Sequence, residues 1–140
     1  MAVPRLPDDV AADTQLDVTV VLPCYNEQDH VVAELERISA ALDASPYSYE
    51  LLVIDDASTD GTLAVLERAV PRFPQMRLMP FHRNGGSGTA RRIGTQQARG
   101  RVVVWTDADM TYPNERIPEL VQMLEDDPSV DQVVGARTSE

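Results

Sequence analysis

Five short apolar runs, separated by segments with helical patterning, constrain the fold of this chain more than any other feature. They begin near residues 18, 50, 76, 101 and 130, and all but the third, which contains two methionines, are rich in valine, leucine or isoleucine. Strands that are apolar throughout are buried on both faces, which is typical of parallel sheets covered by helices on each side. The pattern therefore predicts an α/β fold with a mostly parallel sheet and helices on both faces.

The element boundaries follow from apolar spacing and from turn residues. Strands are predicted at 18–22, 50–54, 76–81, 101–106 and 130–134, and helices at 27–42, 59–70, 86–98 and 118–126. Asn26 is the predicted N-cap of the first helix, and Trp105 is predicted to lie in the core. Residues 1–15 lack apolar periodicity and are predicted to be a mobile leader, which leaves residues 16–140 as one domain.

The charge of the chain is acidic overall but unevenly distributed. The 140 residues carry a formal net charge of −11, and all 12 cationic side chains are arginines. Residues 61–106 hold one acidic residue and eight arginines, a net of +7, whereas residues 107–140 have a net of −7. The acidic balance argues against nucleic-acid binding. A basic middle segment can nevertheless place cations beside an anionic ligand.

No apolar run reaches the ~18 residues of a membrane span, and no signal peptide opens the chain. The sequence therefore predicts a cytoplasmic protein. Cys24, the single cysteine, cannot form an internal disulfide and is predicted to be a small buried residue rather than a nucleophile.

Four polar loops follow the first four predicted strands. They span residues 25–29, 55–60, 84–88 and 107–111. In open α/β sheets, ligands bind outside the carboxyl ends of the strands. The sequence therefore predicts one functional edge that gathers these four loops.

The sharpest of the four motifs is Asp107-Ala108-Asp109, directly after an apolar strand. Alternate residues of an extended chain point the same way, so the two carboxylates can converge. Mg²⁺ or Mn²⁺ would relieve their repulsion, completed by waters and substrate phosphates. The alternative is an Asp turn in which Asp109 caps the segment that follows.

The other three loops carry weaker signals of the same kind. Asp55 and Asp56 stand directly after an apolar strand, where a carboxylate can accept a hydrogen bond from a base or a ribose. The glycine-rich segment 83–91 opens a helix, although it is neither a P-loop nor a complete dinucleotide fingerprint. Tyr25 could form one wall for a base, and Glu27 could accept from ribose or base.

Taken in order, these motifs resemble those of the family 2 glycosyltransferases. The segments are Val20-Val21-Leu22-Pro23-Cys24-Tyr25-Asn26-Glu27, Val53-Ile54-Asp55-Asp56-Ala57-Ser58-Thr59-Asp60-Gly61-Thr62, Asn84-Gly85-Gly86-Ser87-Gly88-Thr89-Ala90, Asp107-Ala108-Asp109-Met110-Thr111-Tyr112-Pro113 and Val134-Gly135-Ala136-Arg137. The resemblance covers residues 18–137 and is greatest to the branch that is similar to dolichyl- or polyprenyl-phosphate sugar transferases.

This resemblance implies a GT-A fold and an inverting transfer from a UDP-, GDP- or dTDP-linked sugar. The acceptor it implies is a lipid phosphate at the inner face of the membrane, or a glycan. It implies donor-binding roles for Pro23, Tyr25, Glu27, Asp55, Asp56, Asn84, Gly86, Gly88, Asp107, Ala108, Asp109 and Arg137. Asp107 and Asp109 would be the metal-binding pair, with Asp109 as the more direct ligand of Mg²⁺ or Mn²⁺.

Two departures from the family pattern affect the expected chemistry. Many lipid-phosphate relatives have Gln-His-Pro where this chain has Thr111-Tyr112-Pro113, so a metal contact from Thr111 is not expected. The family also continues well past its Gly135-Ala136-Arg137 landmark. The catalytic base is therefore unassigned and is expected beyond Glu140.

The absence of lysine counts against two other classes of protein that have aspartate-based active sites. A haloacid-dehalogenase phosphatase and a response-regulator receiver both need a lysine, and this chain has none. The remaining alternative is a nucleotide-sugar-binding module, or a fragment without turnover, that keeps the donor half of the enzyme and lacks the acceptor half.

Overall fold

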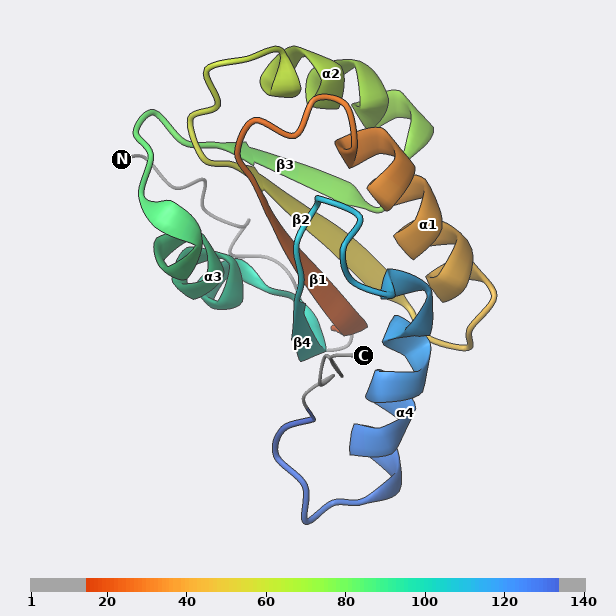
Figure 1. The fold of residues 1–140 in the computed structure, drawn as a ribbon. Coiled ribbons are helices and arrows are strands. Elements are labelled where there is room, and N and C mark those ends of the chain that lie inside the picture. The colour runs from red at the N-terminus through yellow and green to blue at the C-terminus, as the bar shows by residue number, and fades with distance from the viewer. Residues whose placement is uncertain (1–14, 134–140) are drawn as a thin grey trace, which may run out of the picture.

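A four-stranded, all-parallel sheet forms the centre of the protein (Figure 1). A computed structural model describes residues 15–133. Its strands are β1 (Leu16–Cys24), β2 (Tyr49–Asp55), β3 (Met76–Pro80) and β4 (Gly100–Trp105), in the order β3-β2-β1-β4. The predicted parallel sheet is confirmed. The predicted leader lies outside the described residues except for Gln15.

Helices cover both faces of the sheet, as predicted. One face carries α1 (Val31–Asp43), α2 (Thr62–Ala69) and α4 (Ile117–Asp126), and the other carries α3 (Gly86–Gln97) (Figure 1). Two single turns of 3₁₀ helix, η2 (Val70–Arg72) and η3 (Asn114–Arg116), follow α2 and precede α4. Within residues 15–133, no helix combines the length and the apolar character that crossing a membrane requires.

The smaller of the two cores places α3 unusually close to the sheet. Ala90 and Ile93 of α3 pack with Val21 and Ile54. A Cβ at Gly94 would lie 2.5 Å from Val21 Cγ1, closer than real carbon atoms approach. Glycine is therefore required where the helix meets β1, and the beginning of α3 is held at a fixed height above the strand ends.

The direction in which strands are added reverses at β1. The chain builds β2 and β3 on one side of β1 and then crosses to place β4 on its other side. The crossovers before and after β3 run through α2 and α3, which lie on opposite faces of the sheet. Such a switch point, at the carboxyl ends of β1 and β4, is the usual ligand site of an open α/β sheet.

The first helix begins four residues later than predicted, and Asn26 is not its N-cap. α1 begins at Val31, and His30 occupies the N-cap position. Asn26 adopts a left-handed conformation with φ 54°, and a separate turn follows in which Glu27 O accepts from the amides of His30 and Val31. The side chain of Asn26 is used elsewhere, in the candidate site described below.

β4 is an edge strand within the described residues, and two predictions for this region are wrong. Trp105 is 52% exposed rather than in the core, and its Nε1 donates to Thr95 Oγ1 over 2.9 Å. The fifth strand predicted at 130–134 is absent from residues 130–133, while Val134 lies outside the described residues. A groove of about 570 Å³ lies between β4 and this segment.

Candidate functional site

Asp55 ends the central strand and carries a buried oxygen without a partner. Its residue exposure is 2%, and its Oδ1 accepts no hydrogen bond from any residue among those described. Nearly all buried polar atoms in folded proteins are hydrogen-bonded, and an exception calls for an explanation. A donor on a bound ligand would provide one, because Asp55 lies at the ligand-binding edge of the sheet.

Asp56 holds the glycine-rich loop by its backbone. Its carboxylate is almost fully buried, and it accepts from the amide of Gly85 over 2.8 Å and from that of Gly86 over 2.9 Å. Asn84 Nδ2 donates to the carbonyl of Asp56 over 3.1 Å. Hydrogen bonds to an ionised acceptor are stronger than neutral ones. The predicted site residues Asp56, Asn84 and Gly86 are thus brought together.

The glycine-rich loop leaves its backbone open to a ligand. Gly86 has φ 81°, a conformation that favours glycine. No atom lies within 4 Å of the position that a Cβ would take at Gly86 or at Gly88. The loop opens α3, whose first amides favour an anion. The expected contact between this segment and a nucleotide-sugar therefore has the required space.

Asn26 joins the loop after β1 to the loop after β2. Its side-chain Oδ1 accepts from the backbone amides of Thr59 and Asp60 over 2.9 and 3.2 Å. Its backbone N–H donates to Ser58 Oγ. The side chain of the preceding residue, Tyr25, is about half exposed beside this junction. The sequence does single out Asn26, but its local pattern indicates a helix cap rather than this role.

Glu27 and Cys24 complete the end of β1. Burial raises the pKa of the Cys24 thiol, and the charges of Asp55, Glu27 and Asp107 raise it further. The prediction that Cys24 is a small buried residue is confirmed, because the residue is 1% exposed, and its raised pKa favours the neutral thiol. Three predicted site carboxylates thus act on the pKa of this one thiol. Pro23, which is half-buried, pairs with Ile54 inside the sheet.

The Asp107-Ala108-Asp109 motif alternates as expected. Ala108 is buried at 2%, whereas the residues on either side are partly exposed. Asp109 also forms the Asp turn that was the alternative interpretation, because its Oδ1 accepts from Thr111 N over 3.1 Å and from Thr111 Oγ1 over 2.5 Å. The turn fixes the orientation of the Asp109 carboxylate.

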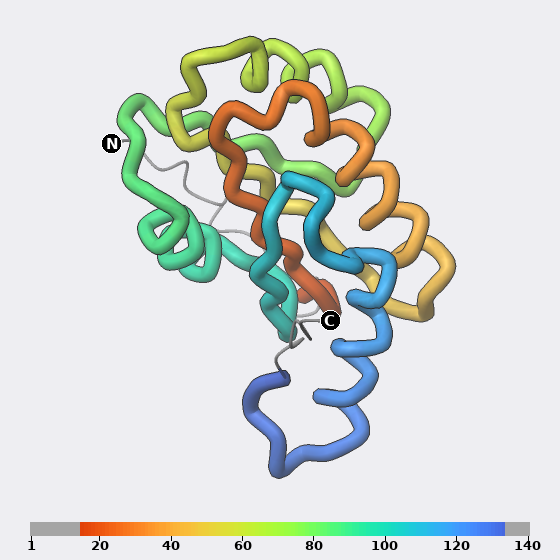
Figure 2. Tube along the Cα trace, viewed as in Figure 1, coloured from red at the N-terminus to blue at the C-terminus, as the bar shows by residue number. Residues whose placement is uncertain are grey.

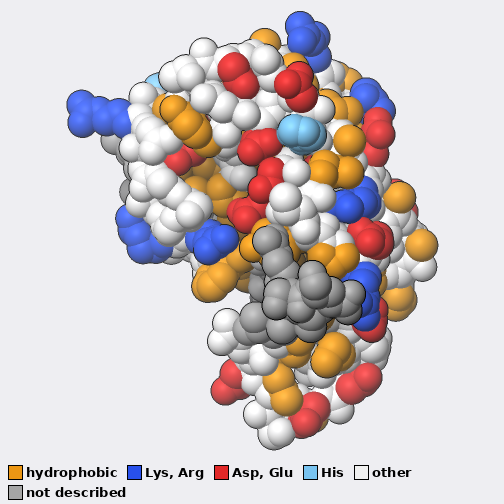
Figure 3. All heavy atoms as spheres, in the orientation of Figure 1, with side chains coloured by type: hydrophobic (Ala, Val, Ile, Leu, Met, Phe, Trp, Pro, Cys, Tyr) orange, Lys and Arg blue, Asp and Glu red, His pale blue; other side chains and the backbone are white. Residues whose placement is uncertain are grey.

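Arg91 of α3 lies beside this motif and was missed as a site residue. Its Nη2 is 3.7 Å from Asp107 Oδ1, and its Nε has no hydrogen-bond partner within the described part of the chain. Figure 3 shows acidic side chains gathered where this face is hollowed, with arginines next to them on the α3 side. The only signal in the sequence was the basic character of residues 61–106.

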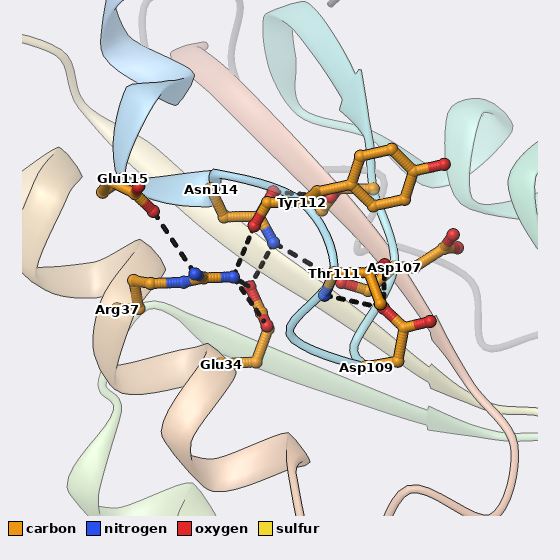
Figure 4. Close-up of polar contacts among 9 residues, drawn as sticks. Glu34, Arg37, Asp107, Asp109, Thr111, Tyr112, Asn114 and Glu115 are labelled. Carbon is orange, nitrogen blue, oxygen red and sulfur yellow. Dashed lines mark hydrogen bonds and ion pairs between the residues drawn. The ribbon is translucent and has the colours of Figure 1, made fainter. Parts of the chain in front are cut away.

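A buried cluster on α1 supports the loop that carries the two aspartates. Glu34 is fully buried and contacts both Arg37 and Asn114, the first residue of η3 (Figure 4). Neither Glu34 nor Asn114 was identified from the sequence as a candidate. The signal for Glu34 is its position, three residues after Val31 and four before Ile38, on the apolar face of the helix.

The donor set fits a hard divalent cation. Within residues 15–133 no group of three or more His, Cys, Asp or Glu side chains could hold a metal by itself. Asp107 and Asp109 would supply carboxylate oxygens, and water and ligand phosphates would supply the rest, which is the usual environment of Mg²⁺ and related ions. The predicted site residue Arg137 lies outside the described residues.

Comparisons with known sequences agree with this geometry. Residues 19–140 match the sequence model of glycosyl transferase family 2. Dodecaprenyl-phosphate galacturonate synthase of Rhizobium johnstonii is 35% identical over 79% of this chain and 33% of its own length. Undecaprenyl-phosphate 4-deoxy-4-formamido-L-arabinose transferase of Pseudomonas fluorescens is 38% identical over 75% of this chain and 31% of its own length. The chain thus spans about a third of the length of these curated relatives.

Solved structures agree as well. The mannosyltransferase PcManGT from Pyrobaculum calidifontis, determined with GDP-Man and Mn²⁺, matches with a TM-score of 0.71 and 32% identity. The match covers 89% of this chain and 37% of that protein. TarS of S. aureus, at 24% identity and a TM-score of 0.61, supports the fold alone. The predicted GT-A fold is confirmed, and the chain belongs to glycosyl transferase family 2.

Proposed function

We propose that this chain is the donor-binding part of an inverting glycosyltransferase that uses a nucleoside-diphosphate sugar and a divalent metal. The acceptor proposed is a polyprenyl phosphate. The observation that carries the proposal is the buried Oδ1 of Asp55, unpartnered among the described residues and placed at the same edge as the Asp107–Asp109 loop. The polyprenyl-phosphate relatives and the GDP-Man and Mn²⁺ complex of PcManGT support the choice of substrates and metal.

The base-binding end is assigned to the ends of β1 and β2. Asp55 would accept an N–H from the nucleobase, which provides the missing hydrogen bond to its buried oxygen. Tyr25 would lie against the base, and Glu27 would accept from a ribose hydroxyl. Asp56 acts indirectly, because its carboxylate is already occupied by the amides of Gly85 and Gly86.

The diphosphate end is assigned to the glycine-rich loop and to Asp107 and Asp109. The open backbone at Gly86 and Gly88 allows the donor to lie along the loop. Asp107 and Asp109 would hold Mg²⁺ or Mn²⁺, which supplies positive charge to the departing diphosphate. Arg91, 3.7 Å from Asp107, adds a fixed cation on the α3 side.

A phosphate acceptor makes a smaller demand on a catalytic base than a sugar hydroxyl does. A polyprenyl phosphate is already ionised at neutral pH, whereas a sugar hydroxyl must lose a proton as it attacks. The place of reaction that follows is the cytoplasmic surface of the membrane, where such an acceptor would present its phosphate.

The test is a calorimetric titration of UDP-, GDP- and dTDP-sugars with Mn²⁺ and with EDTA. In Asp109→Asn, donor affinity in Mn²⁺ is expected to fall more than about tenfold, with little change in EDTA. Asp127→Asn is the matched control, because Asp127 makes the same two contacts with Ser129 that Asp109 makes with Thr111, away from the site.

Each outcome discriminates between functions. Binding of no nucleotide by the wild type would contradict the proposed function. Binding that is equal with and without Mn²⁺ would contradict the metal assignment alone. Donor binding without transfer of labelled sugar to polyprenyl phosphate in vesicles would favour a nucleotide-sugar-binding module.

A further inference from the structure

Side chains of α1 contact the loop between β4 and η3, and these contacts form a brace that supports the loop. Figure 4 shows Glu34 and Arg37 of α1 pointing at the residues that follow Asp107 and Asp109. Figure 2 shows the same relation along the chain, with the loop after β4 approaching α1 before it enters α4. The sheet gives little support to the part of this loop nearest η3, because β4 ends at Trp105.

Asn114 closes the loop at its two ends. It is buried at 3%, its Oδ1 accepts from Thr106 Oγ1 over 2.6 Å, and its Nδ2 lies 3.4 Å from the carbonyl of Asp107. The residue that follows β4 and the residue that opens η3 are therefore joined through a single side chain. The metal-binding motif and its Asp turn lie between them.

Glu34 holds Asn114 in place. The Glu34 carboxylate accepts from Asn114 Nδ2 and from Arg37 Nη2, the latter over 2.8 Å to Oε1 and 3.1 Å to Oε2. Arg37 Nη2 also donates to the carbonyl of Tyr112 over 2.5 Å, inside the loop. A buried charge is tolerated only when it is paired and hydrogen-bonded, so these contacts are coupled to one another.

We propose that Glu34 and Asn114 are positioning residues that hold the Asp107–Asp109 loop in its metal-binding shape, and this inference rests on the proposed function. Neither residue touches the donor in this scheme. Each acts through the backbone of the loop, in the way that outer partners of metal ligands orient those ligands in other sites. The fully buried Glu34 carboxylate therefore supports the diphosphate site from the far side of the loop, without being part of it.

The test uses Glu34→Gln, Asn114→Asp and the double variant. Glu34→Gln removes the charge that Arg37 and Asn114 share, and Asn114→Asp sets two carboxylates against each other. The double variant exchanges the amide and the carboxylate between the two positions, so one can still donate to the other and the charge of the cluster is restored. Glu36→Gln is the matched control, since it makes the same change on the same helix at an exposed ion pair with Arg72.

Two measurements are made on the full chain, and the first needs no ligand. Hydrogen exchange of residues 106–116 is expected to rise about tenfold in each single variant, whereas the amides of β1 and β2 keep their protection. The second is Mn²⁺-dependent binding of the nucleotide-sugar, which is expected to weaken about tenfold without change in EDTA. The double variant is expected to recover most of both losses, and Glu36→Gln to show neither.

The inference fails if the single variants alter the unfolding midpoint but leave loop exchange and Mn²⁺-dependent binding equal to those of Glu36→Gln. It also fails if the double variant is no better than the worse single variant. Should a charge variant not fold, Thr106→Val removes only the hydroxyl that bonds Asn114 and is measured in the same two ways. Failure of the wild type to bind any nucleotide would contradict the proposed function, while the exchange data would still test the brace.

Discussion

Asp55 and Asp56 end the central strand β2, whereas Asp107 and Asp109 follow the edge strand β4. Every residue of β2 is buried, but none of β4 is fully buried. Asp56 is held by two backbone amides of a neighbouring loop, and Asp107 by one ion pair of 3.7 Å on a side chain that is about a third exposed. One acidic strand end is thus held by backbone amides of the glycine-rich loop, and the other by a single side chain of α3.

The difference matches what each end is proposed to bind. A nucleobase is recognised by direction-specific hydrogen bonds, and these are strongest where the protein partners are rigid and shielded from water. A divalent cation that arrives with a diphosphate must keep some waters and exchange others, which requires access to solvent. We therefore expect the base-binding end to be preformed and the metal-binding end to depend on its brace.

The largest expected effect tests how rigidly the base-binding end is held. Asp56→Ala is expected to lower the free energy of unfolding by about 3 kcal/mol, because the amides of Gly85 and Gly86 lose a charged acceptor. Asp107→Ala is expected to cost less than about 0.5 kcal/mol, since its ion pair is partly exposed. Urea unfolding of both variants measures the two values. Equal losses would remove the distinction between the two acidic strand ends.

A smaller effect concerns Cys24, which lies beneath both ends. Its pKa is raised by burial and then by Asp55, Glu27 and Asp107, so the folded thiol stays neutral while the unfolded thiol ionises near its ordinary value of 9.0. Stability is therefore fully present below pH 9 and is lost above it, by about 1.4 kcal/mol per pH unit.

Urea unfolding between pH 8 and 10 measures this loss as the difference between the wild type and Cys24→Ala. Tyr49, whose pKa burial and Asp43 raise to about 12, titrates in both proteins and cancels. The same dependence on pH in both proteins would show that burial and the neighbouring carboxylates do not keep the folded Cys24 thiol neutral.

The smallest expected effect tests the role of Thr111 at the metal-binding end. Thr111→Val removes the hydroxyl that donates to Asp109 Oδ1 but keeps the amide that donates to the same oxygen. Mn²⁺-dependent donor binding is expected to weaken by about 1 kcal/mol, less than in Asp109→Asn. Ser129→Ala, which removes the equivalent hydroxyl from Asp127, should leave donor titrations unchanged. A loss as large as that of Asp109→Asn would make Thr111 a ligand rather than a support.

The sheet was predictable because its strands are continuously apolar and evenly spaced. β1 and β2 match their predicted positions to within two residues at each end, since both lie at the centre of the sheet and every residue is screened from water to some degree. The edge was not predictable in this way. Val102 to Val104 and Trp105 have the composition of a buried strand, but they lie in β4 at the edge of the described sheet.

The candidate site was predictable where the chain itself carries the pattern, and not where distant segments meet. Adjacent aspartates after a strand are visible in the sequence, and so is Asp107-Ala108-Asp109. The contact of Glu34 with Asn114 spans 80 residues, and the contact of Arg91 with Asp107 depends on how closely α3 approaches the sheet. Asn26 shows the opposite case, in which a strong local preference for capping a helix was overridden by tertiary contacts with Thr59 and Asp60.

The order of strands in the sheet also sets the order in which the protein can assemble. Val18 pairs with Tyr49 of β2, 31 residues away, and with Val102 of β4, 84 residues away. Closing the longer loop costs about 0.9 kcal/mol more in chain entropy. Contacts between distant residues also form more slowly. During synthesis the β1-β2-β3 half, with Asp55 and Asp56, is complete before β4 exists, so the metal-binding loop is acquired after the base-binding end.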